Sequence, residues 1–199
     1  MIKDLFFSME TYIRSGGAVM IPILVISFLM WLLILNRVLF FRRLYVRNIS
    51  RDLAGELIKT SREPDAVFQG ANSLLVREFL KARSHDPVLD DFILDETVVR
   101  LISSLDTHLA VIRTLAGIAP LLGLLGTVFG MMATFDVITL FGTGNTRAMA
   151  GGISVALITT QTGLMVSIPG LYMSGFLNKR AQNLKIRIAA TGMYLKRFL

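Results

Sequence analysis

Three stretches of the sequence are long and apolar enough to cross a lipid bilayer as helices. They cover residues 18–41, 115–138 and 152–177, and each reaches the roughly 20 residues that a helix needs to span a hydrocarbon core of about 30 Å. The first stretch outlasts the apolar core of a signal peptide and lacks a small-residue cleavage site, so we interpret it as an uncleaved helix. The chain is therefore predicted to be an all-α integral membrane protein with three transmembrane helices.

Composition supports this fold class and excludes several functions. Charged residues make up 18% of the chain and hydrophobic residues 53%, whereas soluble domains carry roughly 25% charged residues. The net charge of +7 could suggest nucleic acid, but the basic residues cluster beside the apolar stretches, which points to membrane topology and to no nucleic-acid partner. The chain has no cysteine and only two histidines, His85 and His108, so neither a metal site nor a cofactor is predicted. No catalytic set of residues is recognisable, and the chain is predicted not to be an enzyme.

The distribution of lysine and arginine predicts the orientation in the membrane. Basic residues near the ends of spanning helices favour the cytoplasmic side, and only Lys3, Arg14 and Arg147 lie on the opposite side. We therefore expect a multi-pass membrane protein whose N-terminus lies outside and whose C-terminus is cytoplasmic. The residues that define the cytoplasmic side are Arg42, Arg43, Arg47, Arg51, Arg100, Arg113, Lys179, Arg180, Lys185 and Arg187.

The remaining segments form the parts outside the bilayer. Residues 1–17 are predicted to be a periplasmic N-terminal segment, and residues 139–151 a periplasmic loop. Residues 42–114 should form a cytoplasmic domain of two or three helices, since apolar residues recur there at helical spacing between proline breaks. No strong breaker separates this domain from the second span, so its last helix is expected to continue into that span. The third span should likewise continue through residues 178–199 as a cytoplasmic helix.

Small residues recur every three or four positions along the second and third spans. This spacing places them on one face of each helix, where they allow two backbones to approach closely in lipid. The simplest interpretation is packing of the second span against the third within one chain. The residues predicted to make this contact are Gly123, Gly126, Gly130, Gly152, Ala156 and Gly163.

Four consecutive polar side chains, residues 159–162, lie inside the third span. At 100° per residue they sweep about 300° of the helix surface, and polar groups that face hydrocarbon without partners are costly. Thr159 and Thr162 can donate to carbonyls of their own helix, but Gln161 has no comparable local partner. Two other helices can hardly surround this span, so we predict a homo-oligomeric ring with the first helix facing lipid.

Two threonines on the small-residue faces could line a polar path. Thr127 and Thr160 lie at comparable depth in the second and third spans, and each hydroxyl can donate and accept a hydrogen bond. No Asp, Glu, His, Lys or Arg occurs between Leu115 and Phe135 or between Gly152 and Phe176. If protons cross here, a carboxylate must come from another polypeptide. Asp136 lies near the outer end of the second span, where it is a candidate for a periplasmic gate or simply an interfacial residue.

Two sequence motifs resemble those of the ExbB/TolQ/MotA family of proton-channel subunits, and most of all ExbB-like biopolymer transport proteins. Pro-Leu-Leu-Gly-Leu-Leu-Gly-Thr-Val-Phe-Gly-Met-Met at residues 120–132 resembles the second-helix signature, and residues 152–169 resemble the third. The resemblance covers the three-helix layout and is weak in residues 42–100.

The resemblance implies a pentameric ring around the single spanning helices of an ExbD-like dimer, whose aspartate titrates. Proton flow would energise a TonB-like protein acting on outer-membrane receptors, and the pore-facing positions would include Thr127, Thr160, Gln161, Ser154 and Val155. Val155 departs from the family pattern, because many members carry a glutamate there. Because of that departure, the resemblance does not define the route by which protons would enter.

Three alternatives remain open from the sequence. A TolQ-like subunit of the Tol-Pal envelope-integrity system fits nearly as well as an ExbB-like subunit. A membrane scaffold that oligomerises without conducting is favoured by the absence of carboxylates in the spans. A MotA-like stator subunit fits less well, because such proteins usually have four spans and a larger cytoplasmic domain.

Overall fold

The computed structural model describes residues 16–198 except 47 and 66, and the regular secondary structure of these residues is all helical. Most of the N-terminal segment predicted at residues 1–17 therefore lies outside the described residues. Three helices are long and apolar enough to cross a membrane. The main helices are α2 (Met20–Val46), α3 (Arg51–Lys59), α4 (Ala71–Ala82), α5 (Pro87–Asp106), α6 (Leu109–Phe141) and α7 (Thr146–Leu195).

The chain divides into two compact units, which share helices α2 and α7. We call the first the hairpin unit; it contains Val111–Ser174 and the residues up to Ile34. We call the second the polar unit; it contains Leu35–Ala110 and Gly175–Leu199.

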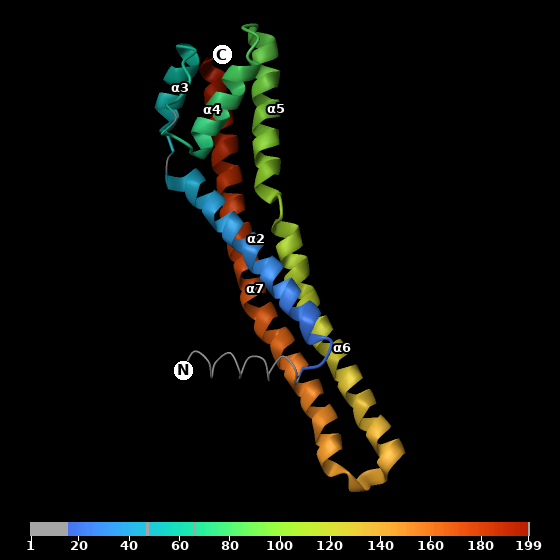
Figure 1. The fold of residues 1–199 in the computed structure, drawn as a ribbon. Helices are drawn as coiled ribbons and strands as arrows, with labels where there is room; N and C mark the ends of the chain where they lie inside the picture. Colours follow the sequence, from blue (N-terminus) through green and yellow to red (C-terminus); the bar gives the residue numbers. More distant parts are fainter. Residues whose placement is uncertain (1–15, 47, 66, 199) are drawn as a thin grey trace, which may run out of the picture. The chain divides into compact units, whose positions relative to one another are not determined.

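In the hairpin unit, α6 and the first part of α7 run antiparallel and are joined by a tight turn (Figure 1). The turn is a short 3-10 helix at Gly142–Gly144, where Gly142 adopts a left-handed backbone with φ of 66°. A residue without a Cβ takes this conformation at little cost. Helix α7 begins at Thr146, so helix extends well into the 139–151 segment that the sequence assigned to a loop.

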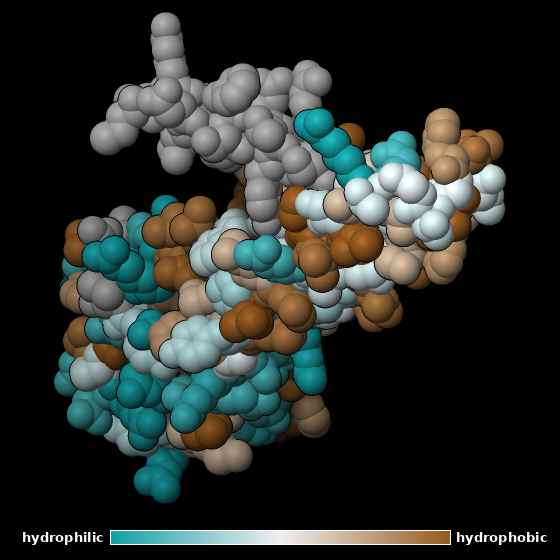
Figure 2. Space-filling view, turned by 90° about the horizontal axis from the view of Figure 1, so that it is seen from below, coloured by the Kyte–Doolittle hydropathy of each residue, from teal (hydrophilic) through white to brown (hydrophobic). Residues whose placement is uncertain are grey.

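In the polar unit, three helices, α3, α4 and α5, follow the end of α2 and pack with the last part of α7. Their number agrees with the sequence prediction of two or three. The buried side chains include Ile58, Leu75, Phe79 and Leu94, and hydrophilic residues predominate on the surface of this unit (Figure 2). Helix α7 is uninterrupted to Leu195, as the apolar spacing of the basic tail predicts.

A buried ion pair fixes the turn between α4 and α5. The guanidinium of Arg83 donates to Asp90 at 3.1 Å, and the amide of Ser84 donates to the same carboxylate at 2.8 Å. Burial by itself raises the pKa of Asp90, but the hydrogen bonds from Ser84 and Arg83 outweigh burial and lower the pKa below its ordinary value. The charged carboxylate thus stabilises this turn.

The predicted continuity between the last helix of the polar segment and the second span is wrong. Helix α5 ends at Asp106 and α6 begins at Leu109, because Thr107 is extended and His108 adopts a left-handed backbone with φ of 65°. The terminal carbonyls of α5 need partners. Arg37 of α2 provides them, since its guanidinium donates to the carbonyl oxygens of Thr107 at 2.6 Å and Ser104 at 2.9 Å.

Candidate pore-lining site

The small-residue faces of α6 and α7 pack directly against each other in the hairpin unit. A Cβ built on Gly130 would lie 2.6 Å from the carbonyl oxygen of Gly152, and one on Gly126 would lie 2.3 Å from the hydroxyl of Thr159. A Cβ on Gly163 would lie 2.7 Å from the carbonyl oxygen of Ala119. The glycines therefore bring the two backbones into contact, and packing within one chain accounts for the small-residue pattern.

The buried threonines of the hairpin unit are satisfied locally. Thr159 donates to the carbonyl oxygens of Val155 at 2.9 Å and Ala156 at 3.0 Å, and Thr162 donates to that of Ile158 at 2.7 Å. These bonds confirm that the two hydroxyls can be accommodated by their own helix. Neither residue requires a second chain.

Thr127 and Thr160 lie on neighbouring turns along one flank of the hairpin. Thr160 donates to the carbonyl oxygen of Ala156 at 3.0 Å and approaches that of Gly123 at 3.4 Å, whereas Thr127 donates to that of Leu124 at 2.6 Å. Thr127 follows Gly123 by four residues and thus lies one turn from this contact. Both threonines are half-exposed, so each hydroxyl oxygen keeps acceptor capacity for a water or a carboxyl group.

Large aliphatic side chains surround this flank and are exposed. Leu124, Met131, Leu157 and Leu164 are between 41% and 66% exposed, and hydrophobic residues cover much of the hairpin surface (Figure 2). The flank that carries Thr127 and Thr160 is therefore left open by the hairpin unit.

Val155 points to a different side of the hairpin. At 100° per residue it lies about 140° around α7 from Thr160. It lines an apolar pocket of about 180 Å³ with Phe129, Ala133 and residues 16–19, which precede α2. No sequence pattern predicts this pocket, because it depends on where the segment before α2 packs against the hairpin.

Ser154 and Gln161 are both exposed, and they lie seven residues apart on one face of α7. At about 160° around α7 from Thr159, Gln161 faces away from the contact with α6. This placement agrees with the inference that Gln161 needs a partner beyond the hairpin.

Asp136 is exposed on α6, and its carboxylate makes no ion pair with Arg147 or another cation in the described part of the chain. Within residues 16–198 no group of histidine, cysteine and carboxylate side chains is arranged to hold a metal. The polar side chains of the second and third spans are therefore mainly the hydroxyls of serine and threonine and the amide of Gln161.

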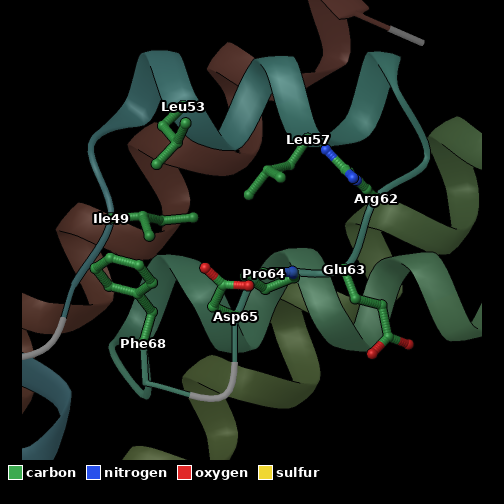
Figure 3. Close-up of a pocket in the computed structure, with 8 residues that line it drawn as sticks. All are labelled: Ile49, Leu53, Leu57, Arg62, Glu63, Pro64, Asp65 and Phe68. Atoms are coloured by element: carbon green, nitrogen blue, oxygen red, sulfur yellow. The ribbon is translucent and has the colours of Figure 1, made fainter.

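A second hollow, of about 330 Å³, lies in the polar unit between α3 and the segment that follows it (Figure 3). Leu53 and Leu57 point into it from α3, and Asp65 approaches from the opposite wall, while Glu63 points away (Figure 3). Its lining combines apolar side chains such as Ile49 and Phe68 with the charged residues Arg62, Glu63 and Asp65. Because Glu63 points away from the hollow, the carboxylates of Glu63 and Asp65 do not face each other across it, and the lining holds no nucleophile with a base.

Residues 63–190 match the MotA/TolQ/ExbB proton channel family. The chain belongs to this family. Two relatives from Synechocystis sp. are named putative biopolymer transport proteins ExbB-like 1 and ExbB-like 3. The first is 31% identical over 77% of this chain and 64% of its own length, and the second is 32% identical over 79% of each.

The chain is also similar to a Tol-Pal system protein TolQ from Haemophilus influenzae. That protein is 35% identical over 41% of the chain and 36% of its own length. The family match and the three apolar helices identify a membrane protein of a proton-channel family. They do not separate an ExbB role from a TolQ role.

Proposed function

We propose that this chain is an ExbB-like subunit of an inner-membrane motor that uses the proton motive force to energise TonB-dependent outer-membrane transport. The observation that carries the proposal is the open flank of the hairpin, where two half-exposed hydroxyls lie among exposed aliphatic side chains. Both hydroxyls donate within their own helices, and their oxygens keep acceptor capacity that a covering helix or water in the ring can use.

In the proposed assembly, copies of the chain form a ring, with five as the expected number, and Thr127 and Thr160 face its interior. Gln161 and Ser154 then contact a neighbouring copy or the water-filled interior. An ExbD-like protein dimer provides single spanning helices inside the ring, and its carboxylate carries the proton. The ring wall contributes hydroxyls that accept from or donate to that carboxyl group as it changes sides.

Proton flux in proteoliposomes tests this function. Flux is measured with a pH dye under an imposed potential, for the chain alone, for the chain with an ExbD-like protein, and for that complex with the partner's membrane aspartate changed to asparagine. We expect flux only in the second case, because threonine and glutamine do not ionise in the physiological range. Substantial flux through the chain alone contradicts the proposal, and a tight complex without flux favours a non-conducting scaffold.

The pore-lining residues are tested by Thr127→Val and Thr160→Val in the conducting complex. Each change removes a hydroxyl and keeps the shape, so flux should fall by at least tenfold while the complex still assembles. Thr139→Val is the matched control, since its hydroxyl also donates to a carbonyl of its own helix, that of Asp136 at 2.9 Å. Equal flux in all three variants would remove the two threonines from the pathway.

A further inference from the structure

Two arginines of α7 flank one tyrosine of α2 in the polar unit. The guanidinium carbon of Arg180 lies 5.7 Å from the centre of the Tyr45 ring, and that of Arg187 lies 5.3 Å from the same centre. Arg180 also lies 4.7 Å from the centre of the Phe176 ring. Cation–π contacts of this length hold both guanidinium groups close to one aromatic residue.

The spacing of the residues brings further donors to the same place. Arg180 and Arg187 are seven residues apart, and Asn183 lies between them on the same face of α7. Arg42 lies three residues before Tyr45 on α2 and is also exposed. Arg180 and Arg187 therefore contact the Tyr45 ring from α7, and helical spacing places Arg42 of α2 and Asn183 of α7 on the adjoining turns.

Among the described residues these arginines have no acidic partner, whereas several other cations of the polar unit do. Arg83 pairs with Asp90, Lys185 with Asp106, and Lys196 with Asp91 and Asp95. None of the ion pairs between described residues includes Arg42, Arg180 or Arg187. The cluster thus keeps its full positive charge and its hydrogen-bond donors for a ligand.

The place of the cluster along the helices indicates which anion it meets. Tyr45 lies at the end of the apolar segment Met20–Tyr45, and Phe176 lies at the end of the predicted third span. Aromatic residues at the ends of spans lie at the depth of lipid headgroups, and guanidinium groups bind phosphate oxygens through paired hydrogen bonds. A phosphate at this depth is that of a phospholipid.

We propose that Arg42, Arg180 and Arg187, arranged around Tyr45, form a binding site for the headgroup of an anionic phospholipid. The guanidinium groups bind the phosphodiester, and the phenol ring holds them apart and in place. The acyl chains lie against the exposed apolar side of α2. This site does not depend on proton conduction, so it can fail while the proposed function stands.

Native mass spectrometry of the full chain in detergent, with phosphatidylglycerol or phosphatidylcholine added, tests the site. We expect phosphatidylglycerol to bind at least tenfold more tightly than phosphatidylcholine, and Arg180→Gln with Arg187→Gln to weaken that binding by at least tenfold. Each arginine near an anionic lipid contributes about fivefold. The matched control is Arg100→Gln with Arg113→Gln, which removes the same charge from exposed arginines of α5 and α6.

Two further measurements complete the test, one on a Tyr45 variant and one with inorganic phosphate as a competitor. Tyr45→Leu leaves all three charges and removes the ring that orders them, so it should weaken binding by a few-fold even if the double variant fails to fold. Inorganic phosphate at millimolar concentration should not displace the lipid, since it lacks the acyl chains. Three outcomes would overturn the proposal. The control variant could lose as much phosphatidylglycerol binding as the arginine double variant, or neither that double variant nor Tyr45→Leu could lose any. Inorganic phosphate could also displace the lipid.

Discussion

The hairpin unit and the polar unit use different interactions to join their helices. In the hairpin unit, glycines bring the backbones of α6 and α7 into contact, and the hydroxyls of Thr134 and Thr159 donate to carbonyls of their own helices. In the polar unit, side chains connect one helix to another. Asn72 donates to the carbonyl of Ile49 and accepts from Thr191, and Lys185 pairs with Asp106.

The difference follows from the surroundings of each unit. Lipid tails are as apolar as leucine, so association of helices in a bilayer depends on close packing, and small residues at the contact make it close. In the polar unit, whose surface is mainly hydrophilic (Figure 2), burial of Leu75, Phe79 and Leu94 contributes the stabilisation. Ion pairs and capping side chains then specify which helix ends meet. The hairpin unit accordingly exposes its large aliphatic residues, which the polar unit mostly buries.

The largest effect is expected from Gly130→Ala in the hairpin unit. The new methyl group would lie 2.6 Å from the carbonyl oxygen of Gly152 and 2.7 Å from the amide nitrogen of Ala156, and backbone atoms cannot rotate away. We expect a loss of about 3 kcal/mol in the free energy of unfolding, measured in mixed micelles. Gly117→Ala on the same helix is the control, because nothing lies within 4 Å of its added Cβ. Equal stability of the two variants would mean that α6 and α7 are not in backbone contact.

An intermediate effect is expected from Arg37→Met in the polar unit. The change keeps the aliphatic part of the side chain but leaves the carbonyls of Ser104, Leu105 and Thr107 without their charged donor. Hydrogen bonds to charged groups contribute about 1.5–3 kcal/mol, so we expect a loss of roughly 2 kcal/mol. Arg43→Met, at an exposed position of the same helix, should change stability by less than about 0.5 kcal/mol. If Arg37→Met left the free energy of unfolding unchanged, water would be replacing the guanidinium at the α5–α6 break.

The smallest effect is expected from Asp90→Asn, and it should depend on pH. Asparagine still accepts from the Ser84 amide but loses the charge that attracts Arg83, which should cost about 1 kcal/mol near pH 7. The folded protein lowers the pKa of Asp90 below its ordinary value of 3.8. The stabilisation is therefore present above that pH and disappears as the pH falls through the lowered pKa.

Unfolding of the wild-type chain and of Asp90→Asn between pH 3 and pH 7 measures this dependence. The difference in unfolding free energy between the two proteins should narrow at the acid end of the range. A gap that stays constant, or widens in acid, would show that the charge of Asp90 is not what stabilises the α4–α5 turn.

Much of the hairpin unit could be predicted from the sequence, because its rules are local. A run of apolar residues defines a span, and glycines at intervals of three or four define the face that packs, as the contacts of Gly123, Gly126 and Gly130 show. The same patterns supported the family resemblance, which the match over residues 63–190 confirms. The pore-lining roles of Thr127, Thr160, Gln161, Ser154 and Val155 stay predictions, since they concern contacts beyond one chain.

The break between α5 and α6 could not be predicted, although its residues are adjacent in the sequence. Thr107 and His108 are ordinary helix residues by propensity, and the partner that satisfies the broken end, Arg37, lies some 70 positions earlier. The same holds for Arg180 and Arg187, whose shared partner Tyr45 lies on another helix. By itself the sequence determined the spans, the packing faces and the family, because each depends on periodicity within one segment. The tertiary structure alone decided the helix break, the open flank and the arginine cluster. Each of these depends on whether a segment distant in the sequence packs against the residues concerned.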